Sequence, residues 1–91
     1  MDITRNDILM KLRNELNSIM VFMGNENANK PIEEDAHLTE QLALDSLDIM
    51  DFTSRAELFY KLEINNDNFE ELYNIGLIAD YIYNGLNKNN A

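Results

Sequence analysis

The sequence predicts an all-α fold, a small bundle of three main helices plus one short helix, with a long loop between the first and second main helices. Apolar residues recur at three- and four-residue spacing, which keeps one face of a helix apolar. No segment alternates apolar and polar residues as a half-buried strand does. A chain of 91 residues fits one domain, for which we expect residues 1–86, followed by a disordered tail at residues 87–91.

The first predicted helix begins after Thr4, which forms a capping pattern with Asp7 three residues later. It ends at Gly24, where the apolar pattern also ends. The face that we expect to be buried consists of Ile8, Leu9, Leu12, Leu16, Ile19, Met20 and Met23.

The long loop follows, because residues 25–30 are polar and unpatterned and Pro31 comes next. Three apolar residues recur within residues 31–44, and we expect them to hold the loop against the core: Ile32, Leu38 and Leu42. The second helix is predicted to begin near Ser46, with an oxygen of Asp45 or Ser46 as its cap, and to run to about Leu62. Its expected inward face is Phe52, Ala56, Phe59 and Tyr60.

The polar run at residues 65–68 favours a turn, because asparagine and aspartate side chains bond to their own backbone. A short helix is expected at residues 67–72. Asn74 then caps a last helix from Ile75 to Tyr83, which Gly85 ends. The expected buried face of this helix is Ile75, Ile78, Ala79 and Ile82.

The net charge of −10 belongs entirely to residues 33–71, because the charges before and after that stretch cancel. A surface of that sign repels phosphate backbones, so we expect no nucleic-acid partner. The chain has no cysteine and one histidine, which excludes zinc clusters, thiol nucleophiles and disulfides. The acidic residues lack the glycine and the spacing of a calcium loop, so we expect no metal site.

The longest apolar run, residues 19–23, is far too short for a membrane span. No basic segment followed by an apolar one opens the chain, so nothing predicts secretion. We therefore expect a cytoplasmic monomer without a membrane span.

The segment Leu42-Ala43-Leu44-Asp45-Ser46-Leu47-Asp48 resembles the phosphopantetheine attachment site of acyl carrier proteins, whose pattern is leucine, glycine, any residue and then Asp-Ser-Leu-Asp. The family also places an apolar residue, a glutamate, an aromatic residue and an isoleucine at fixed distances after the serine. Those positions hold Phe52, Glu57, Tyr60 and Ile64. Ile75 and residues 79–82 match the family's closing helix, so the resemblance covers about residues 38–84.

The resemblance implies a carrier and not an enzyme. A phosphopantetheinyl transferase would attach 4′-phosphopantetheine from coenzyme A to the Ser46 hydroxyl, and the cofactor would hold acyl intermediates as thioesters in fatty-acid, polyketide or related specialised synthesis. An isolated serine before a helix would be interpreted as an ordinary N-cap, but Asp45 can fill that role here. A phosphodiester at Ser46 would lie near the positive end of the helix dipole.

The resemblance also implies a docking surface for basic patches on the transferase and on acyl-processing enzymes. Acidic residues recur every three positions from Asp45, and apolar side chains lie among them. The candidate contact residues are Asp45, Leu47, Asp48, Met50, Asp51 and Glu57.

An acyl pocket between the second helix and the later helices is a further implication. Carried over by position, its lining would be Leu38, Leu42, Ala56, Ile64, Phe69, Leu72 and Ile78. Phe69 and Ile78 replace alanines that are common in the family, which favours short acyl chains, or cargo held largely outside, because cores pack at high density. Ala56 stands where the family usually has leucine, and the volume that it leaves in the pocket opposes the restriction by Phe69.

Three departures from the family pattern indicate a specialised carrier. Ala43 replaces the glycine before the serine, Arg55 replaces a small apolar residue, and residues 22–34 make the first connection longer than usual. A D-alanyl or peptidyl carrier would share the fold and the modified serine, but it would more often differ from Leu47-Asp48 after that serine. A cofactor-free acidic interaction module is the other alternative, and it would never acquire the arm.

Overall fold

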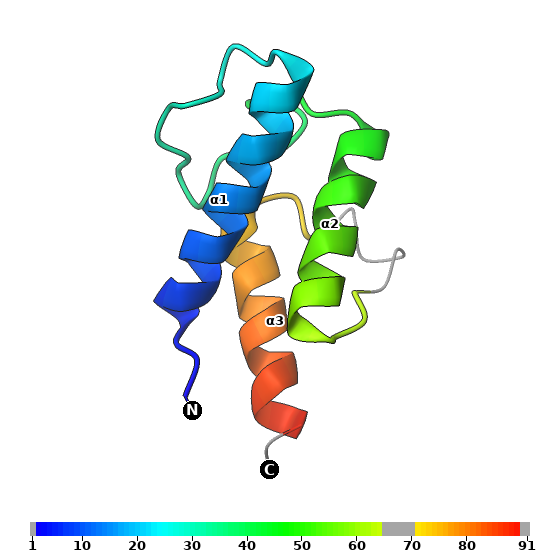
Figure 1. Cartoon of the computed structure of the whole chain (residues 1–91). Helices are drawn as coiled ribbons and strands as arrows, with labels where there is room; N and C mark the ends of the chain where they lie inside the picture. The colour runs from blue at the N-terminus through cyan, green and yellow to red at the C-terminus, as the bar shows by residue number, and fades with distance from the viewer. Residues whose placement is uncertain (1, 65–70, 90–91) are drawn as a thin grey trace.

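The computed structural model describes residues 2–64 and 71–89, which form three helices and contain no strand. They are α1 (Arg5–Met23), α2 (Ser46–Tyr60) and α3 (Ile75–Asn89). Helices α2 and α3 both run opposite to α1, which packs against each of them (Figure 1). The all-α fold with three main helices is as the sequence predicts. The predicted turn at 65–68 and most of the predicted short helix at 67–72 lie outside the described residues, and residues 71–72 are not helical.

Helix α1 begins and ends where its capping residues predict. The Thr4 hydroxyl accepts a hydrogen bond from the Asp7 N–H (3.1 Å), and the Asp7 carboxylate accepts one from the Thr4 N–H (3.0 Å). Gly24 ends the helix in the left-handed region, at φ 71°. The predicted buried face is confirmed except at Met23, which is 53% exposed because it lies in the last turn, beyond the core.

Helix α2 is capped by Asp45, and Ser46 is its first residue. The helix ends at Tyr60, before the predicted Leu62, because Lys61 takes the left-handed conformation with φ 53°. The prediction that Phe59 faces the core is wrong. Its side chain is 57% exposed, and its ring lies under the Lys11 ammonium of α1, 4.1 Å from the ring centroid.

Helix α3 starts as predicted, because the Asn74 side chain accepts a hydrogen bond from the Leu77 N–H (2.8 Å). It does not stop before Gly85 but continues to Asn89. A Cβ on Gly85 would come within 2.8 Å of Leu62 Cδ2, so this glycine permits close packing inside a helix. The predicted disordered tail at 87–91 is therefore helical as far as Asn89, and its last two residues lie outside the described residues.

The connection from Gly24 to Asp45 is irregular but anchored. The Arg13 Nε donates to the Ile32 carbonyl (3.0 Å), and the Asn25 Nδ2 donates to the Leu42 carbonyl (2.8 Å). The three predicted anchors of the connection are Ile32, Leu38 and Leu42, and all three are confirmed as buried. They join a core that also includes residues from all three helices. The loop therefore returns residues 37–44 to a fixed place beside the start of α2.

Candidate functional site

Ser46 occupies the first turn of α2 with an exposed side chain. Asp45 and Asp48, not Ser46, cap the helix. The Asp45 carboxylate accepts from the Asp48 N–H (2.9 Å), and the Asp48 carboxylate accepts from the Asp45 N–H (3.2 Å). The Ser46 hydroxyl makes no hydrogen bond to any described residue. It is available for chemistry at the end of a helix where unpaired N–H groups favour negative charge.

The backbone before Ser46 turns sharply at Ala43, whose φ is 58°. Buried Leu42 and Leu44 lie on either side of it, and the Leu44 N–H donates to the Leu38 carbonyl (3.0 Å). These anchors force an alanine into the left-handed region, which costs about 1–2 kcal/mol for a residue with a Cβ. The family glycine that alanine replaces would adopt this conformation without that cost.

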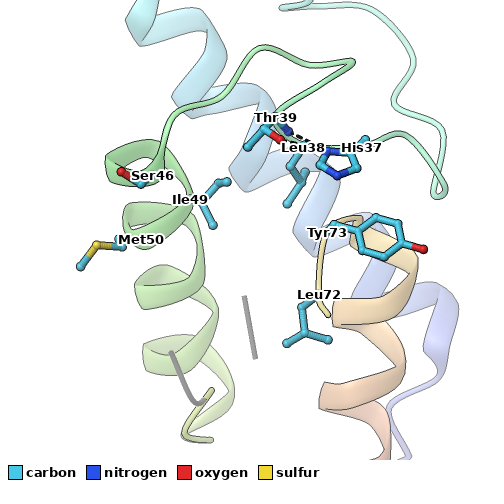
Figure 2. Close-up of a pocket in the computed structure, with 8 residues that line it drawn as sticks. All are labelled: His37, Leu38, Thr39, Ser46, Ile49, Met50, Leu72 and Tyr73. Carbon is cyan, nitrogen blue, oxygen red and sulfur yellow. Dashed lines mark hydrogen bonds between the residues drawn. The ribbon is translucent and has the colours of Figure 1, made fainter. Parts of the chain in front are cut away.

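A half-open cleft of about 420 Å³ lies beside Ser46 (Figure 2). Side chains from the first turns of α2 form one side, and residues preceding α3 form the other, with residues 37–39 between them. We call it the Ser46 cleft, and its lining is His37, Leu38, Thr39, Ser46, Ile49, Met50, Leu72 and Tyr73. Apolar surface therefore extends away from the serine.

The predicted acyl-pocket residues divide into three groups. Leu38 and Leu72 line the Ser46 cleft. Phe69 lies outside the described residues, so the prediction that it restricts chain length stays a prediction. The remaining four are buried in the core and are absent from the described wall of the cleft: Leu42, Ala56, Ile64 and Ile78.

Sequence reasoning missed four residues of this cleft: His37, Thr39, Ile49 and Tyr73. The His37 ring caps the turn that follows it, because its Nδ1 accepts from the N–H groups of Thr39 (3.3 Å) and Glu40 (3.2 Å). The ring also stacks on Tyr73, with centroids 5.1 Å apart and planes 18° apart. No local pattern predicts that stack, because it depends on where the long loop returns.

The candidate docking residues lie along α2, and most have a second role within the molecule. Leu47 is 73% exposed and Met50 is 47% exposed, so both present apolar surface near Ser46. Asp51 Oδ1 bonds to Arg55 Nε (3.3 Å). Glu57 Oε2 accepts from the Ile64 N–H (3.1 Å), which holds the segment that follows α2.

Arg55 joins α2 to α1. Its Nη1 lies 3.3 Å from Glu15 Oε2, and Lys11 Nζ lies 2.9 Å from the other oxygen of the same carboxylate. Hydrogen bonds from Lys11 and Arg55 lower the pKa of Glu15, although partial burial opposes them. The carboxylates of Asp51 and Glu15 raise the pKa of Arg55. Arg55 therefore interrupts the negative surface that the sequence predicts along α2.

Within the part of the chain that the structure describes, no three acidic or histidine side chains converge as ligands for a metal ion. None of the described helices combines the length and the apolar character needed to cross a membrane.

A model of the family described as "phosphopantetheine attachment site" matches residues 25–82. The match spans more than half of the chain and includes Ser46, and the chain belongs to this family of carrier proteins, in which 4′-phosphopantetheine is attached covalently. A solved structure of the acyl carrier protein from Enterococcus faecalis is similar, with a TM-score of 0.67 and 24% identity, over 91% of this chain and 99% of that one. The chain therefore has the acyl carrier protein fold. No curated protein matches it closely in sequence.

The residues at the site fit such a group. An exposed hydroxyl without a bond to the described residues begins α2, and the adjoining cleft is mainly apolar. A phosphodiester at this hydroxyl would project into solvent at the positive end of the helix.

Proposed function

We propose that this chain is an acyl carrier protein that carries acyl intermediates as thioesters on a 4′-phosphopantetheine arm attached to Ser46. One observation carries the proposal: the Ser46 hydroxyl is exposed and free of the capping role, and Ser46 lines a mainly apolar cleft of about 420 Å³. When bound, the cofactor supplies a terminal thiol, which this cysteine-free chain lacks.

The chain's own residues perform three tasks in this function. Ser46 offers its hydroxyl to the transferase, and the first turn of α2 stabilises the negative charge of the phosphodiester. Asp45 and Asp48 hold the start of the helix through their reciprocal capping bonds. Leu38, Ile49 and Leu72 provide apolar surface for the start of the cargo.

The proposed partners are a phosphopantetheinyl transferase and acyl-processing enzymes with basic docking patches. The exposed apolar side chains of Leu47 and Met50 would contact them, and methionine suits a surface that meets several partners because its side chain adapts. The proposed pathways are fatty-acid, polyketide or related specialised synthesis, and the proposed location is the cytoplasm. Leu47-Asp48 after the serine favours an acyl carrier over a D-alanyl or peptidyl one.

Intact-mass measurement after incubation with coenzyme A and a broad-specificity transferase tests this function. We expect the wild-type chain to gain one phosphopantetheinyl group and Ser46→Ala to gain none. The matched control is Ser54→Ala, which removes another exposed serine from the same helix and should be modified like the wild type. An unchanged wild-type mass with several active transferases would instead support a cofactor-free interaction module.

A further inference from the structure

The hydrogen bonds of His37 fix the position of its proton. Three donors converge on Nδ1: the Thr39 N–H at 3.3 Å, the Thr39 hydroxyl at 3.0 Å and the Glu40 N–H at 3.2 Å. Two of them are backbone N–H groups, which can only donate, so Nδ1 carries no proton. A flipped ring would put a C–H group there and lose all three bonds. The neutral imidazole therefore carries its proton on Nε2.

His37, which carries this Nε2–H group, is one of the residues that line the Ser46 cleft. Of the four polar side chains in the lining, Ser46 is the proposed attachment site, the Thr39 hydroxyl donates to His37, and Tyr73 stacks on the His37 ring. Among the described residues, Nε2 has no hydrogen-bond partner, and no fully buried side-chain nitrogen lacks one, so Nε2 is at least partly exposed to solvent. Stacking on Tyr73 holds the plane of the ring.

Cargo that enters the Ser46 cleft beside His37 replaces the water at this N–H group. An alkyl chain that covers this N–H would remove its water without replacing the hydrogen bond, and a buried unpaired donor is costly. A cargo with a carbonyl or hydroxyl oxygen would replace that water with a hydrogen bond. We propose that His37 Nε2–H binds such an oxygen, so that this carrier favours oxygen-bearing acyl groups over unsubstituted alkyl groups of equal length. This inference rests on the proposed attachment at Ser46.

The test compares two cargoes that differ by one carbonyl. A broad-specificity transferase, supplied with butanoyl-coenzyme A or 3-oxobutanoyl-coenzyme A, loads each acyl arm, and intact mass confirms one arm per chain. We expect the 3-oxobutanoyl form to unfold at a temperature roughly 4–8 °C higher than the butanoyl form, the effect of one net hydrogen bond in a domain of this size.

Two variants separate the donor from the structural role of His37. His37→Ser keeps an oxygen that can accept from the turn N–H groups but removes the ring donor, so the difference between the cargoes should disappear. Asn17→Ala removes two bonds to Asn29 and loosens the same loop away from the cleft, so it should keep the difference. If both variants lost the difference in unfolding temperature between the two cargoes equally, the effect would come from loop stability, and the proposal would be overturned.

A second readout observes the donor directly. His37 is the chain's single histidine, so a long-range ¹H–¹⁵N spectrum shows one imidazole. We expect the Nε2 signal to shift with 3-oxobutanoyl cargo and to stay in place with butanoyl cargo. The same shift from the arm alone would mean that an amide carbonyl of the arm is the acceptor and would overturn the cargo preference. Equal unfolding temperatures and an unmoved signal on loaded protein would overturn this inference alone, whereas failure to load any arm would overturn the proposed function as well.

Discussion

At the residue scale, the backbone before Ser46 combines a fixed geometry with an unfavourable residue. Ala43 lies between two buried leucines and is held at φ 58°, where the Cβ of an L-residue crowds the following carbonyl. The sequence identified Ala43 as a departure from a glycine pattern, but the sign of φ required the structure. The exposed alanine methyl group gains little from packing to offset the strain.

We predict that Ala43→Gly raises the free energy of unfolding by about 0.5–1 kcal/mol. Relief of left-handed strain contributes about 1–2 kcal/mol, and the greater backbone entropy of glycine in the unfolded chain opposes it by about 0.4–1 kcal/mol. Urea unfolding measures the change. Ala28→Gly, at a loop position without positive φ, should be destabilising, and a loss of stability in Ala43→Gly would contradict the strained geometry.

At the element scale, local sequence signals predicted where the helices begin better than where they end and which side chains they bury. Thr4, Asp45 and Asn74 cap their helices through side-chain bonds to residues three positions away, so the necessary information is in the local sequence. The predicted end of α3 was wrong, because Gly85 does not stop the helix but allows close packing against Leu62, a contact that only the tertiary structure creates. Phe59 was misplaced for a similar reason, since its spacing fits the core but its ring packs under a cation from α1.

Arg5 is the clearest link between the start of α1, the loop and α3. It lies 2.9 Å from Glu34 Oε1 and 2.6 Å from Asp80 Oδ1. These carboxylates raise the pKa of Arg5, and the hydrogen bond from Arg5 lowers the pKa of Glu34. The folded protein therefore binds a proton at Glu34 less readily than the unfolded chain does, so this stabilisation is present above the ordinary glutamate pKa of about 4.3.

We predict that Arg5→Gln destabilises the protein at pH 7 and that the difference from the wild type shrinks as the pH falls below about 4.3, through the lowered pKa of Glu34. Urea unfolding of both proteins across this range gives the difference directly, which removes the general effect of protonating an acidic chain. Lys88→Gln removes an exposed cation elsewhere and should show no such trend. A wild-type advantage that is independent of pH would contradict the ion-pair explanation.

At the scale of the whole molecule, charge and apolar surface meet around the start of α2. The sequence predicted the acidic stretch, the candidate serine and Leu38 and Leu72 of the cleft. It could not predict the His37–Tyr73 stack or the pairing of Arg55 with Glu15, because both join segments far apart in the chain. On α2 itself Arg55 pairs with Asp51, and it does not pair with Asp45, Asp48 or Glu57.

We predict that the triple variant Asp45→Asn, Asp48→Asn and Asp51→Asn is modified by a transferase about tenfold more slowly than the wild type, because charge complementarity speeds association. Asparagine keeps the capping oxygens, so the helix should still form. The control triple removes equal charge from exposed sites elsewhere: Asp2→Asn, Glu33→Gln and Asp35→Asn. Rates should fall with added salt, and equal slowing in both triples without salt dependence would rule out docking by local charge.

The most direct test of the central claim is to locate the modification by fragmenting the modified protein in a mass spectrometer. The chain has three serines, Ser18, Ser46 and Ser54, and fragment masses between them separate the candidates. We predict that all of the added phosphopantetheinyl mass maps to Ser46. Mass on Ser18 or Ser54, or on no serine, would contradict the assignment of the exposed first residue of α2 as the attachment site.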